Sequence, residues 1–215
     1  MNNTDLSALR DAIKQAPGKY YQLEQLTSIR CGNNPVTLRP VDFGLVTDDT
    51  ITETMPLMFN MSPEVKKFLP TLDFSTDEKI KKFAMFTSER TEAGLQFTYG
   101  IYFNNLLVGM IFVNTPIMNK MGMGFDEWTL DFFIFKPLEG QRVMSVALMH
   151  MMLFLQKTIG VDTFYLLVDH DNERCINLIE QLPIDRVASD GFHNLEKQGT
   201  PPLVFVCPLS QIRFQ

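Results

Sequence analysis

The stretch KPLEGQRVMSVALMHMMLF, residues 136–154, decides the fold because it carries a polar turn directly into an apolar helical pattern. The segment before it, residues 127–136, is rich in aromatic and branched side chains and predicts a strand. Apolar spacing after the turn predicts a helix over residues 141–159, ended by the glycine that follows. A helix start behind a strand can bind an anion through its backbone N–H groups. Turns that do so usually carry several glycines, whereas this one has only Gly140. The turn is therefore interpreted either as a phosphate-binding turn whose glycines have been replaced or as an ordinary tight turn.

The segments around this turn predict a mixed α/β fold. Two apolar runs joined by Asn104 and Asn105 predict an antiparallel hairpin, because asparagine tolerates positive φ. The strand, turn and helix over residues 127–159 then lead into another strand, which is a crossover connection. The other predicted helices span residues 5–16, 50–69 with a break at Ser62-Pro63, 75–92 and 172–182, and the other strands span residues 36–41, 163–169 and 202–209. This order predicts a mixed sheet with helices on both faces.

The length of 215 residues fits one domain with an appendage. A polar link, RCGNNP at residues 30–35, separates a first helical piece from the remainder of the chain. We therefore expect an N-terminal helical extension and linker over residues 1–35 and one domain over residues 36–215. The extension is expected either to pack as an added helix or to make an oligomer contact, such as that of a homodimer.

The composition excludes several classes of protein. A net charge of −6 argues against a nucleic-acid surface, which needs clustered Lys and Arg side chains. The three cysteines are widely spaced and indicate neither a disulfide framework nor a metal site. The N-terminus lacks a basic-then-apolar signal pattern, and the longest apolar run, residues 143–155, falls short of the about 20 residues that span a bilayer. We expect a cytoplasmic protein with no metal, no membrane and no nucleic-acid partner.

Five segments, taken in order, resemble N-acetyltransferases of the GNAT superfamily, specifically the ribosomal-protein alanine acetyltransferase subgroup. They are VTLRPVD (36–42), SPEVKKFLP (62–70), LLVGMIFVN (106–114), the stretch 136–154, and LLVDHDNERCINLIEQL (166–182). The resemblance covers residues 36 to about 209. It implies a central mixed, mostly antiparallel sheet and an enzyme that uses acetyl-CoA as co-substrate. The acceptor would be a primary amine, on a protein N-terminus or a small molecule, that attacks directly in a ternary complex.

Three departures from that family support an alternative function. The family's turn reads Gln/Arg-x-x-Gly-x-Gly/Ala, and this chain has Glu139, Arg142 and Met144 at those positions. Pro183-Ile184 replaces the usual Gly-Phe, and Ile179 stands where many members carry a tyrosine that acts as general acid. The alternative is a catalytically inactive GNAT-like module for binding or regulation. A third interpretation is an unrelated α/β protein whose element order matches by accident.

The resemblance implies a coenzyme site built from three segments. The pyrophosphate would meet backbone N–H groups of the turn and helix start, and the pantetheine arm would pair with the strand before the turn. Asn172 would bond the pantetheine arm or cap the following helix, or do both. Cys175 occupies a position where the family has a small residue, and we expect it to be a packing residue before a reactive thiol. The implied coenzyme-binding residues are Phe133, Ile134, Phe135, Gly140, Gln141, Arg142, Val143, Met144, Ser145, Asn172 and Cys175.

Catalysis requires a base that makes the amine neutral. Glu127 and Asp131 are the candidates, because residues four apart on a regular strand project to the same face. A solvent-facing strand end is the alternative for Glu127, and a structural hydrogen bond is the alternative for Asp131. Asn172 completes the candidate active site. His150 falls in an apolar helical stripe and reads as a core histidine with a satisfied nitrogen, while the Met- and Gly-bearing segment 118–123 reads as a substrate-facing lid or a hairpin connection.

Overall fold

The strands form one sheet, and the computed structural model describes residues 25–26, 28–41, 56, 63–69, 72–187 and 201–209. Eight strands lie in the order β1-β2-β3-β4-β5-β6-β8-β7. Strands β5 and β6 pair in parallel, and the other neighbouring strands pair antiparallel. The predicted mixed, mostly antiparallel sheet is confirmed.

The bounds of the elements agree closely with the periodicity of the sequence. The strands are β1 Ile29–Cys31, β2 Asn34–Pro40, β3 Gln96–Phe103, β4 Leu106–Asn114, β5 Trp128–Ile134, β6 Thr163–Val168, β7 Asp185–Val187 and β8 Leu203–Pro208. The helices are α3 Pro63–Phe68, α4 Asp77–Glu92, α5 Pro116–Met123, α6 Val143–Phe154 and α7 Glu173–Ile179, with a 3₁₀ turn η1 Lys136–Leu138 and a π-helical turn η2 Leu155–Ile159. Within the described ranges, no helix has the length and apolar character needed to cross a bilayer. The predicted helix over residues 5–16, and nearly all of residues 50–62, lie outside the described residues.

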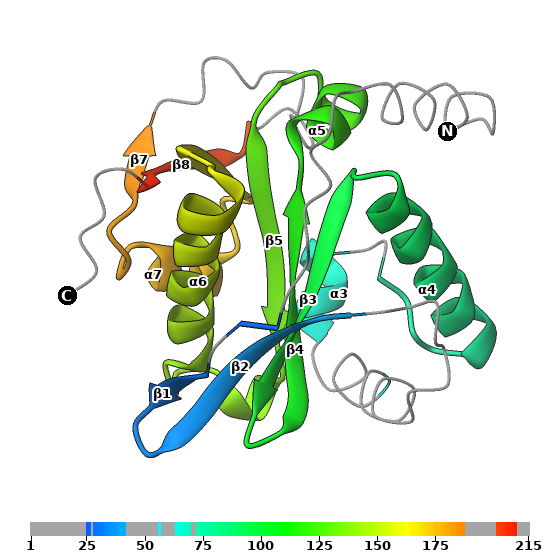
Figure 1. The fold of residues 1–215 in the computed structure, drawn as a ribbon, viewed down its shortest axis with the longest axis vertical. Helices are drawn as coiled ribbons and strands as arrows, with labels where there is room; N and C mark the ends of the chain where they lie inside the picture. Colours follow the sequence, from blue (N-terminus) through cyan, green and yellow to red (C-terminus); the bar gives the residue numbers. More distant parts are fainter. Residues whose placement is uncertain are drawn as a thin grey trace.

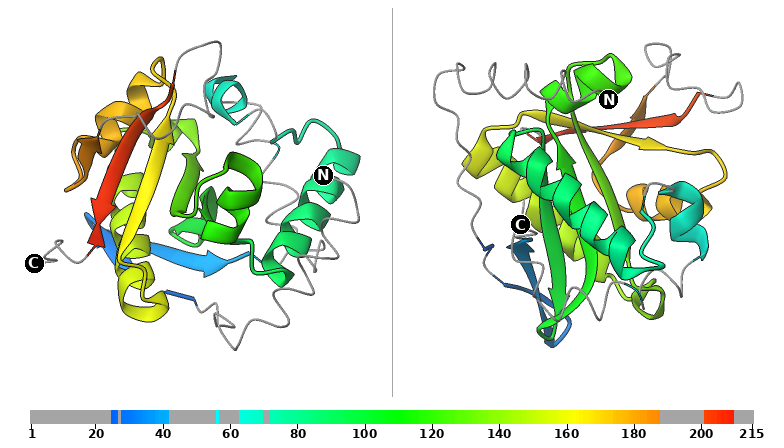
Figure 2. Two further views of the ribbon diagram at one scale, coloured as in Figure 1. Left: turned by 90° about the horizontal axis from the view of Figure 1, so that it is seen from above. Right: turned by 90° about the vertical axis from the view of Figure 1, so that its right-hand side faces the viewer.

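The two faces of the sheet carry separate apolar cores, with α6 and α7 on one face and α3 and α4 on the other (Figure 1). On the α6 face, the ring of Tyr99 in β3 lies 5.6 Å from that of Phe154. On the α4 face, Phe83 makes edge contacts with Phe74 and Phe112, at centroid distances of 4.7 and 6.2 Å. The views from above and from the side show α4 lying along β3 and β4 (Figure 2). Helices therefore cover both faces, as the sequence predicts.

The sheet also includes two short strands that the sequence pattern did not indicate. Strand β1 pairs with β2, with Ile29 opposite Val36, and so lies before the expected start of the main domain. Strand β7 pairs with β8 at the opposite edge of the sheet. Each has three residues, which is too short to show a two-residue alternation.

The predicted hairpin between β3 and β4 is confirmed. Phe103 pairs with Leu106, so Asn104 and Asn105 form the two-residue connection. Their φ angles are 51° and 63°, the left-handed values that a tight hairpin turn of this length needs.

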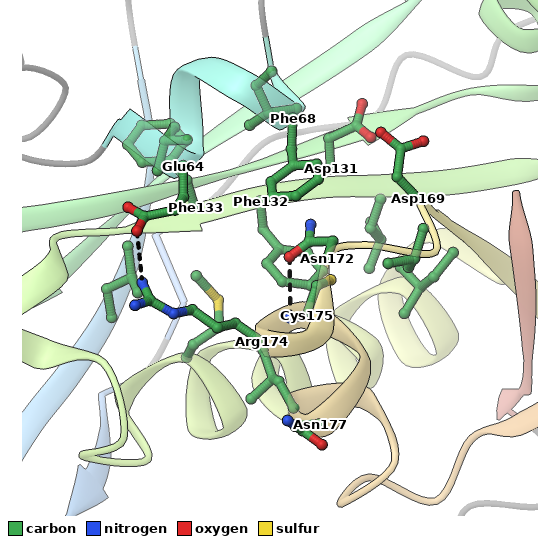
Figure 3. A pocket seen from close by; sticks show the side chains of 18 of the residues that line it. Glu64, Phe68, Asp131, Phe132, Phe133, Asp169, Asn172, Arg174, Cys175 and Asn177 are labelled. Atoms are coloured by element: carbon green, nitrogen blue, oxygen red, sulfur yellow. Dashed lines mark hydrogen bonds and ion pairs between the residues drawn. The ribbon is translucent and has the colours of Figure 1, made fainter. Parts of the chain in front are cut away.

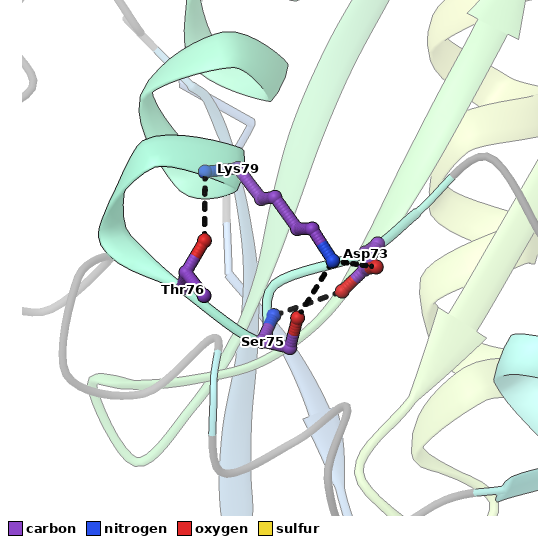
Figure 4. Close-up of polar contacts among 4 residues, drawn as sticks. All are labelled: Asp73, Ser75, Thr76 and Lys79. Carbon is purple, nitrogen blue, oxygen red and sulfur yellow. Dashed lines mark hydrogen bonds and ion pairs between the residues drawn. The ribbon is translucent and has the colours of Figure 1, made fainter.

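The start of α4 is held by a small polar cluster (Figure 4). The Thr76 hydroxyl caps the helix by accepting from the N–H of Lys79 at 3.3 Å. The ammonium of Lys79 bonds the Asp73 carboxylate at 2.6 Å and the Ser75 hydroxyl at 3.0 Å. The bond from Lys79, followed by bonds from Ser75, holds the pKa of Asp73 well below its usual range. These contacts fix the helix start predicted near residues 75–78.

The hairpin-connection alternative for residues 118–123 is confirmed, because the segment joins the antiparallel strands β4 and β5. The segment forms a helix, α5, and not the loop that we expected. The Thr115 hydroxyl caps it by accepting from the N–H of Met118, and Pro116 occupies its first turn. Gly124 ends it with a φ of 78°. The side-chain amide of Asn119 donates to the carbonyl of Glu127 at 2.6 Å, which ties the helix to the entry of β5.

Substitution of Gly109 by alanine is expected to destabilise the protein by about 2–4 kcal/mol, as for other overpacked core sites. A β-carbon there would lie 2.4 Å from the carbonyl oxygen of Phe133 and 3.0 Å from Cα of Ile134, both in the backbone of β5. Urea unfolding measures the loss. The matched control is Gly122→Ala in α5, where a β-carbon meets nothing within 4 Å and helix propensity predicts a gain of up to about 1 kcal/mol. Equal stability of the two variants would contradict this close approach of β4 and β5.

Candidate active site

Strands β5 and β6 are paired at their beginnings and separate beyond that point. The register joins Trp128 to Phe164 and Thr129 to Tyr165, whereas β5 continues along β4 as far as Ile134. The later part of β5 therefore presents an edge of the sheet to a gap that widens toward η1. This open edge belongs to the strand with which the resemblance pairs the pantetheine arm. A gap between the third and fourth predicted strands was also expected, and it is absent, because β4 and β5 pair from Gly109 opposite Ile134 to Asn114 opposite Thr129.

A cavity of about 780 Å³ occupies the gap between β5 and β6. Helices α6 and α7 bound it on one face of the sheet, and α3 bounds it on the other (Figure 3). The cavity therefore connects the two faces through the opening between β5 and β6. Its wall includes Phe68 of α3, Asp131 and Phe132 of β5, Ser145 of α6, Asn172, and Cys175 of α7.

The turn before α6 has the backbone shape of an anion cradle although it contains one glycine. Gly140 has a φ of 75° and Arg142 a φ of 62°, so an arginine adopts the left-handed conformation at the position where the family has glycine. The first hydrogen bond of the helix runs from the N–H of Val146 to the carbonyl of Arg142. The N–H groups of residues 143–145 come before that bond and have no acceptor within the helix.

The side chains of this turn leave the cavity open. Arg142 is exposed at its wall, Met144 is 6% exposed, and Ser145 is half-buried. Gly140 also lines the cavity, whereas Val143 is fully buried in the core beneath and the Gln141 amide donates to the carbonyl of Pro137. The bulky residues at positions 142 and 144 therefore line the cavity, which keeps its volume of about 780 Å³ with both side chains in place.

We expect Arg142→Gly to stabilise the protein by about 0.5–1 kcal/mol. A left-handed conformation costs a residue with a side chain about 1–2 kcal/mol, and the greater chain entropy of glycine cancels part of the gain. Arg142→Ala removes the same side chain but keeps the strain, so its stability should stay near that of the native chain. Thermal unfolding of the three proteins separates the two effects, and a Gly variant no more stable than the Ala variant would show that the turn is unstrained.

The three predicted pantetheine partners at the end of β5, Phe133, Ile134 and Phe135, differ in where their backbone N–H groups point. The N–H of Phe135 donates to the carbonyl of Val108 at 2.6 Å, and its carbonyl accepts from Leu138 at 2.9 Å. Both backbone groups of Phe135 are thus used within the protein, and its geometry does not support the predicted role. Because N–H groups alternate along a strand, that of Phe133 also faces β4 while that of Ile134 faces the gap. Phe133 also lines the cavity.

Asn172 lies at the point where β6 leads into α7. Its side-chain oxygen accepts from the N–H of Cys175 at 3.3 Å and so caps the helix. The side-chain nitrogen points away from the helix start that the oxygen caps, and Asn172 lines the cavity (Figure 3). Capping therefore leaves the two N–H donors of this amide directed toward the space that the pantetheine arm would fill.

Cys175 lines the cavity and is half-buried. Burial raises the pKa of its thiol to about 12, and the Asp131 carboxylate adds to the rise. A thiol with such a pKa is protonated at neutral pH and is a poor nucleophile. The expectation of a packing residue at this position agrees with its environment.

Asp131 lies in the cavity wall, two residues beyond the last pairing of β5 with β6. The side-chain amide of Asn114 donates to its carboxylate at 2.8 Å, and Gln96 donates to the oxygen of that amide at 2.6 Å. Burial lowers the pKa of Arg90 in α4, and the Asp131 carboxylate opposes that effect. A buried polar network thus holds the carboxylate in place next to a cation.

Glu127 does not line the cavity. It precedes the first residue of β5, at the end of the gap that the pairing with β6 closes. Its carboxylate acts on Tyr165, whose phenol pKa is raised by burial and then by this charge. The structure brings Asp131 and Asn172 together in one cavity and leaves Glu127 outside it.

The two histidines in the described part of the chain, His150 and His170, do not line the cavity. His150 lies in α6 and is 9% exposed, and its Nδ1 is buried without a hydrogen-bond partner among the described residues. The expected core position is confirmed, and Nδ1 is the nitrogen that lacks a partner within the described ranges. Burial lowers the pKa of this imidazole. The exposed His170 bonds the carbonyl of Pro201 through Nε2 at 2.9 Å.

Four further cavity residues were not predicted as site residues, although they lie in two of the five segments that carry the resemblance, residues 62–70 and 166–182. Phe68 and Glu64 reach the cavity from α3, Asp169 from the end of β6, and Arg174 from α7 (Figure 3). Asp169 follows β6 directly, and acidic residues at strand ends are a signal for a site, whereas nothing in the sequence places α3 against this gap.

Comparison with known proteins places this arrangement in a structural class. No protein-family model and no curated protein matches the sequence. Among solved structures, RimJ from Mycobacterium smegmatis, in complex with a CoA disulfide, has a TM-score of 0.65 at 10% identity over 90% of this chain and 90% of that chain. This chain has the GNAT acetyltransferase fold.

Two further structures with the GNAT fold agree. A ribosomal-protein-S5-alanine acetyltransferase from Vibrio fischeri has a TM-score of 0.62 at 14% identity, over 86% of this chain and 98% of that chain. RimL, a ribosomal L7/L12 α-N-protein acetyltransferase in complex with coenzyme A, has a TM-score of 0.58 at 18% identity, over 84% of this chain and 96% of that chain. The fold implied by the five sequence segments is confirmed.

Proposed function

We propose that this GNAT-fold chain is an acetyl-CoA-dependent N-acetyltransferase that transfers an acyl group to a primary amine by direct attack in a ternary complex. The observation that carries the proposal is the cavity through the sheet. It joins the helix start of α6 on one face to the Asp131 carboxylate on the other. A transferase of this kind needs both an anion cradle and a basic group on opposite sides of one opening.

The cavity runs from the start of α6 to the paired beginnings of β5 and β6, and acetyl-CoA is expected to lie along it. The N–H groups at the start of α6 form the anion site at the wide end of the gap. The open edge of β5, with the N–H of Ile134 facing the gap, leads from there toward the narrow end near Thr129. Bound acetyl-CoA supplies the thioester, whose C–S bond breaks as the amine nitrogen forms the new C–N bond. The narrow end is where that carbonyl would lie.

Asp131 is suited to accept the proton that the amine must lose. It lies at the narrow end of the gap, and the amide of Asn114 fixes its orientation. A neighbouring N–H on the open edge of β5 can donate to the oxygen of the carbonyl as negative charge develops there. The role of Asn172 in this arrangement is to bind the pantetheine arm through its side-chain nitrogen while it caps α7.

The acceptor is expected to approach from the face that carries α3 and α4. Phe68 and Asp169 line the cavity there together with Asp131, so an apolar wall and two carboxylates surround the opening (Figure 3). Carboxylates attract a cationic amine before it is deprotonated. The similar structures are named as acetyltransferases of ribosomal proteins, which favours a protein N-terminus over a small amine.

One observation favours a non-catalytic binding module as the second candidate. Ile179 is the last residue of α7 and is fully buried in the core. It stands at the position where many family members carry a tyrosine that acts as general acid. No side chain at that position can protonate a thiolate, so the proton would have to come from elsewhere in the site.

Titration calorimetry with CoA, followed by an acetylation screen with peptide and polyamine amines, tests the proposal. We expect CoA to bind and at least one peptide amine to be acetylated. Binding of CoA without acetylation of any amine would support the binding module. Absence of CoA binding at about millimolar concentration, where ligands have only about 4 kcal/mol of binding free energy, would exclude the enzyme and leave a module that binds something other than CoA.

A further inference from the structure

Two cations and two carboxylates form a cluster at the wide end of the cavity. The guanidinium of Arg174 in α7 lies 2.9 Å from the Glu139 carboxylate and 3.7 Å from the Glu64 carboxylate. The ammonium of Lys136 in η1 lies 3.7 Å from the same oxygen of Glu64. Glu64, Glu139 and Arg174 all line the cavity, next to the start of α6. The cluster therefore borders the place where a diphosphate would bind.

Glu64 reaches this cluster from the opposite face of the sheet. Helix α3 packs with the core on the α4 face, whereas Arg174 belongs to α7 on the α6 face. The ion pair between Glu64 and Arg174 therefore crosses the cavity (Figure 3). A carboxylate held between two cations makes the same kind of charge-assisted contacts that a phosphate oxygen makes.

We propose that Lys136 and Arg174 are phosphate-binding cations of the coenzyme site and that Glu64 is an internal anion which a phosphate of the coenzyme displaces. This inference rests on the proposed function, because it assigns further residues to the same site. Glu139 also competes with a phosphate for Arg174, because its carboxylate forms a second ion pair with the same guanidinium. The affinity for the coenzyme is then set by a competition between two protein carboxylates and a phosphate.

The geometry of Glu64 is that of a displaceable group. Its Oε2 is buried without a hydrogen-bond partner among the described residues, which is unfavourable for a carboxylate oxygen. Its side chain and that of Arg174 are 42% and 55% exposed, and exposed ion pairs contribute little to stability. A phosphate brings more charge and more acceptor oxygens than one carboxylate, and it can bond Arg174 and the N–H groups of α6 together. The exchange is therefore favourable once the coenzyme is present.

Calorimetry with CoA and with 3′-dephospho-CoA tests the competition in the full chain. Glu64→Gln is expected to bind CoA about 3- to 10-fold tighter, and Arg174→Gln about 10-fold more weakly. In a Lys136→Gln, Arg174→Gln background, Glu64→Gln should gain less affinity, because the cations for which Glu64 and a phosphate compete are gone and only direct repulsion between the two anions remains. Glu180→Gln, which removes the same charge from the exposed end of α7 outside the cavity, is the control and should change CoA affinity less than about twofold.

The outcomes separate this inference from the proposed function. If the native chain binds no CoA, both fail. If the native chain binds CoA and Glu64→Gln binds it equally or more weakly, the inference alone fails. If Glu64→Gln gains affinity for CoA but not for 3′-dephospho-CoA, the displaced contact belongs to the 3′-phosphate, and an equal gain for both assigns it to the diphosphate. Unfolding curves of each variant show that the comparison is made on folded protein.

Discussion

Replacement of Asp131 by asparagine is expected to lower the turnover of amine acetylation by about 10²- to 10⁴-fold, which is the usual contribution of a general base. Asparagine keeps the size of the side chain and an oxygen that can accept from Asn114, so the bond at 2.8 Å can persist. The substitution removes the negative charge and the capacity to take a proton. Affinity for CoA should change little, because the residue lies at the opposite end of the gap from the start of α6.

Glu127→Gln is the matched comparison for this prediction, since it makes the same chemical change one residue before the first β5–β6 pair, outside the cavity. We expect its turnover to stay within about threefold of the native value, as for substitutions outside a site. The pH profile gives a second measure, because loss of the base should remove the acidic limb of the turnover curve. A large loss in the Glu127 variant with little loss in the Asp131 variant would reverse the assignment of the base.

The sequence was informative about the fold wherever a segment was long enough to show a period. The hairpin of β3 and β4, helix α6 and strand β6 each run over six residues or more and lie close to their predicted bounds. Strands β1 and β7 were missed because three residues carry no period. Helix α5 was missed for a different reason. Its methionines and glycines suggested a loop, although Thr115-Pro116 at one end and Gly124 at the other are the signals of a capped helix.

The candidate site was predictable to the extent that it is contiguous in sequence. The turn at residues 140–145, strand β5 and Asn172 belong to one strand–helix–strand crossover, which brings them to one gap. Glu64 and Arg174 are 110 positions apart in the chain and meet only because α3 packs beside the opening. The two-residue period of a strand placed Glu127 and Asp131 on the same face, so the sequence could not choose between them as the base. Only the register of β5 with β6 shows that the gap opens after Thr129 and leaves Glu127 outside.

Ser145→Glu is expected to weaken CoA binding by about 10- to 100-fold while it leaves the fold intact or slightly more stable. Ser145 is the third residue of α6 and lies in the cavity wall, so a carboxylate there would face the anion site. Two unit charges about 5 Å apart at an effective dielectric constant of about 20 repel each other by about 3 kcal/mol, or about 100-fold in affinity. The same charge near a helix N-terminus stabilises the helix by about 0.3–1 kcal/mol.

The opposite signs of these two effects make the substitution diagnostic of the cradle. A variant that loses affinity because it unfolds loses stability as well, whereas this variant should bind CoA more weakly at an unchanged or higher unfolding temperature. Ser145→Gln adds nearly the same volume without the charge, so calorimetry on both variants separates repulsion from crowding. We expect the Gln variant to keep most of the affinity. If the two variants bind CoA equally, the N–H groups at the start of α6 do not face the phosphates, because repulsion by a carboxylate at that distance follows from Coulomb's law alone.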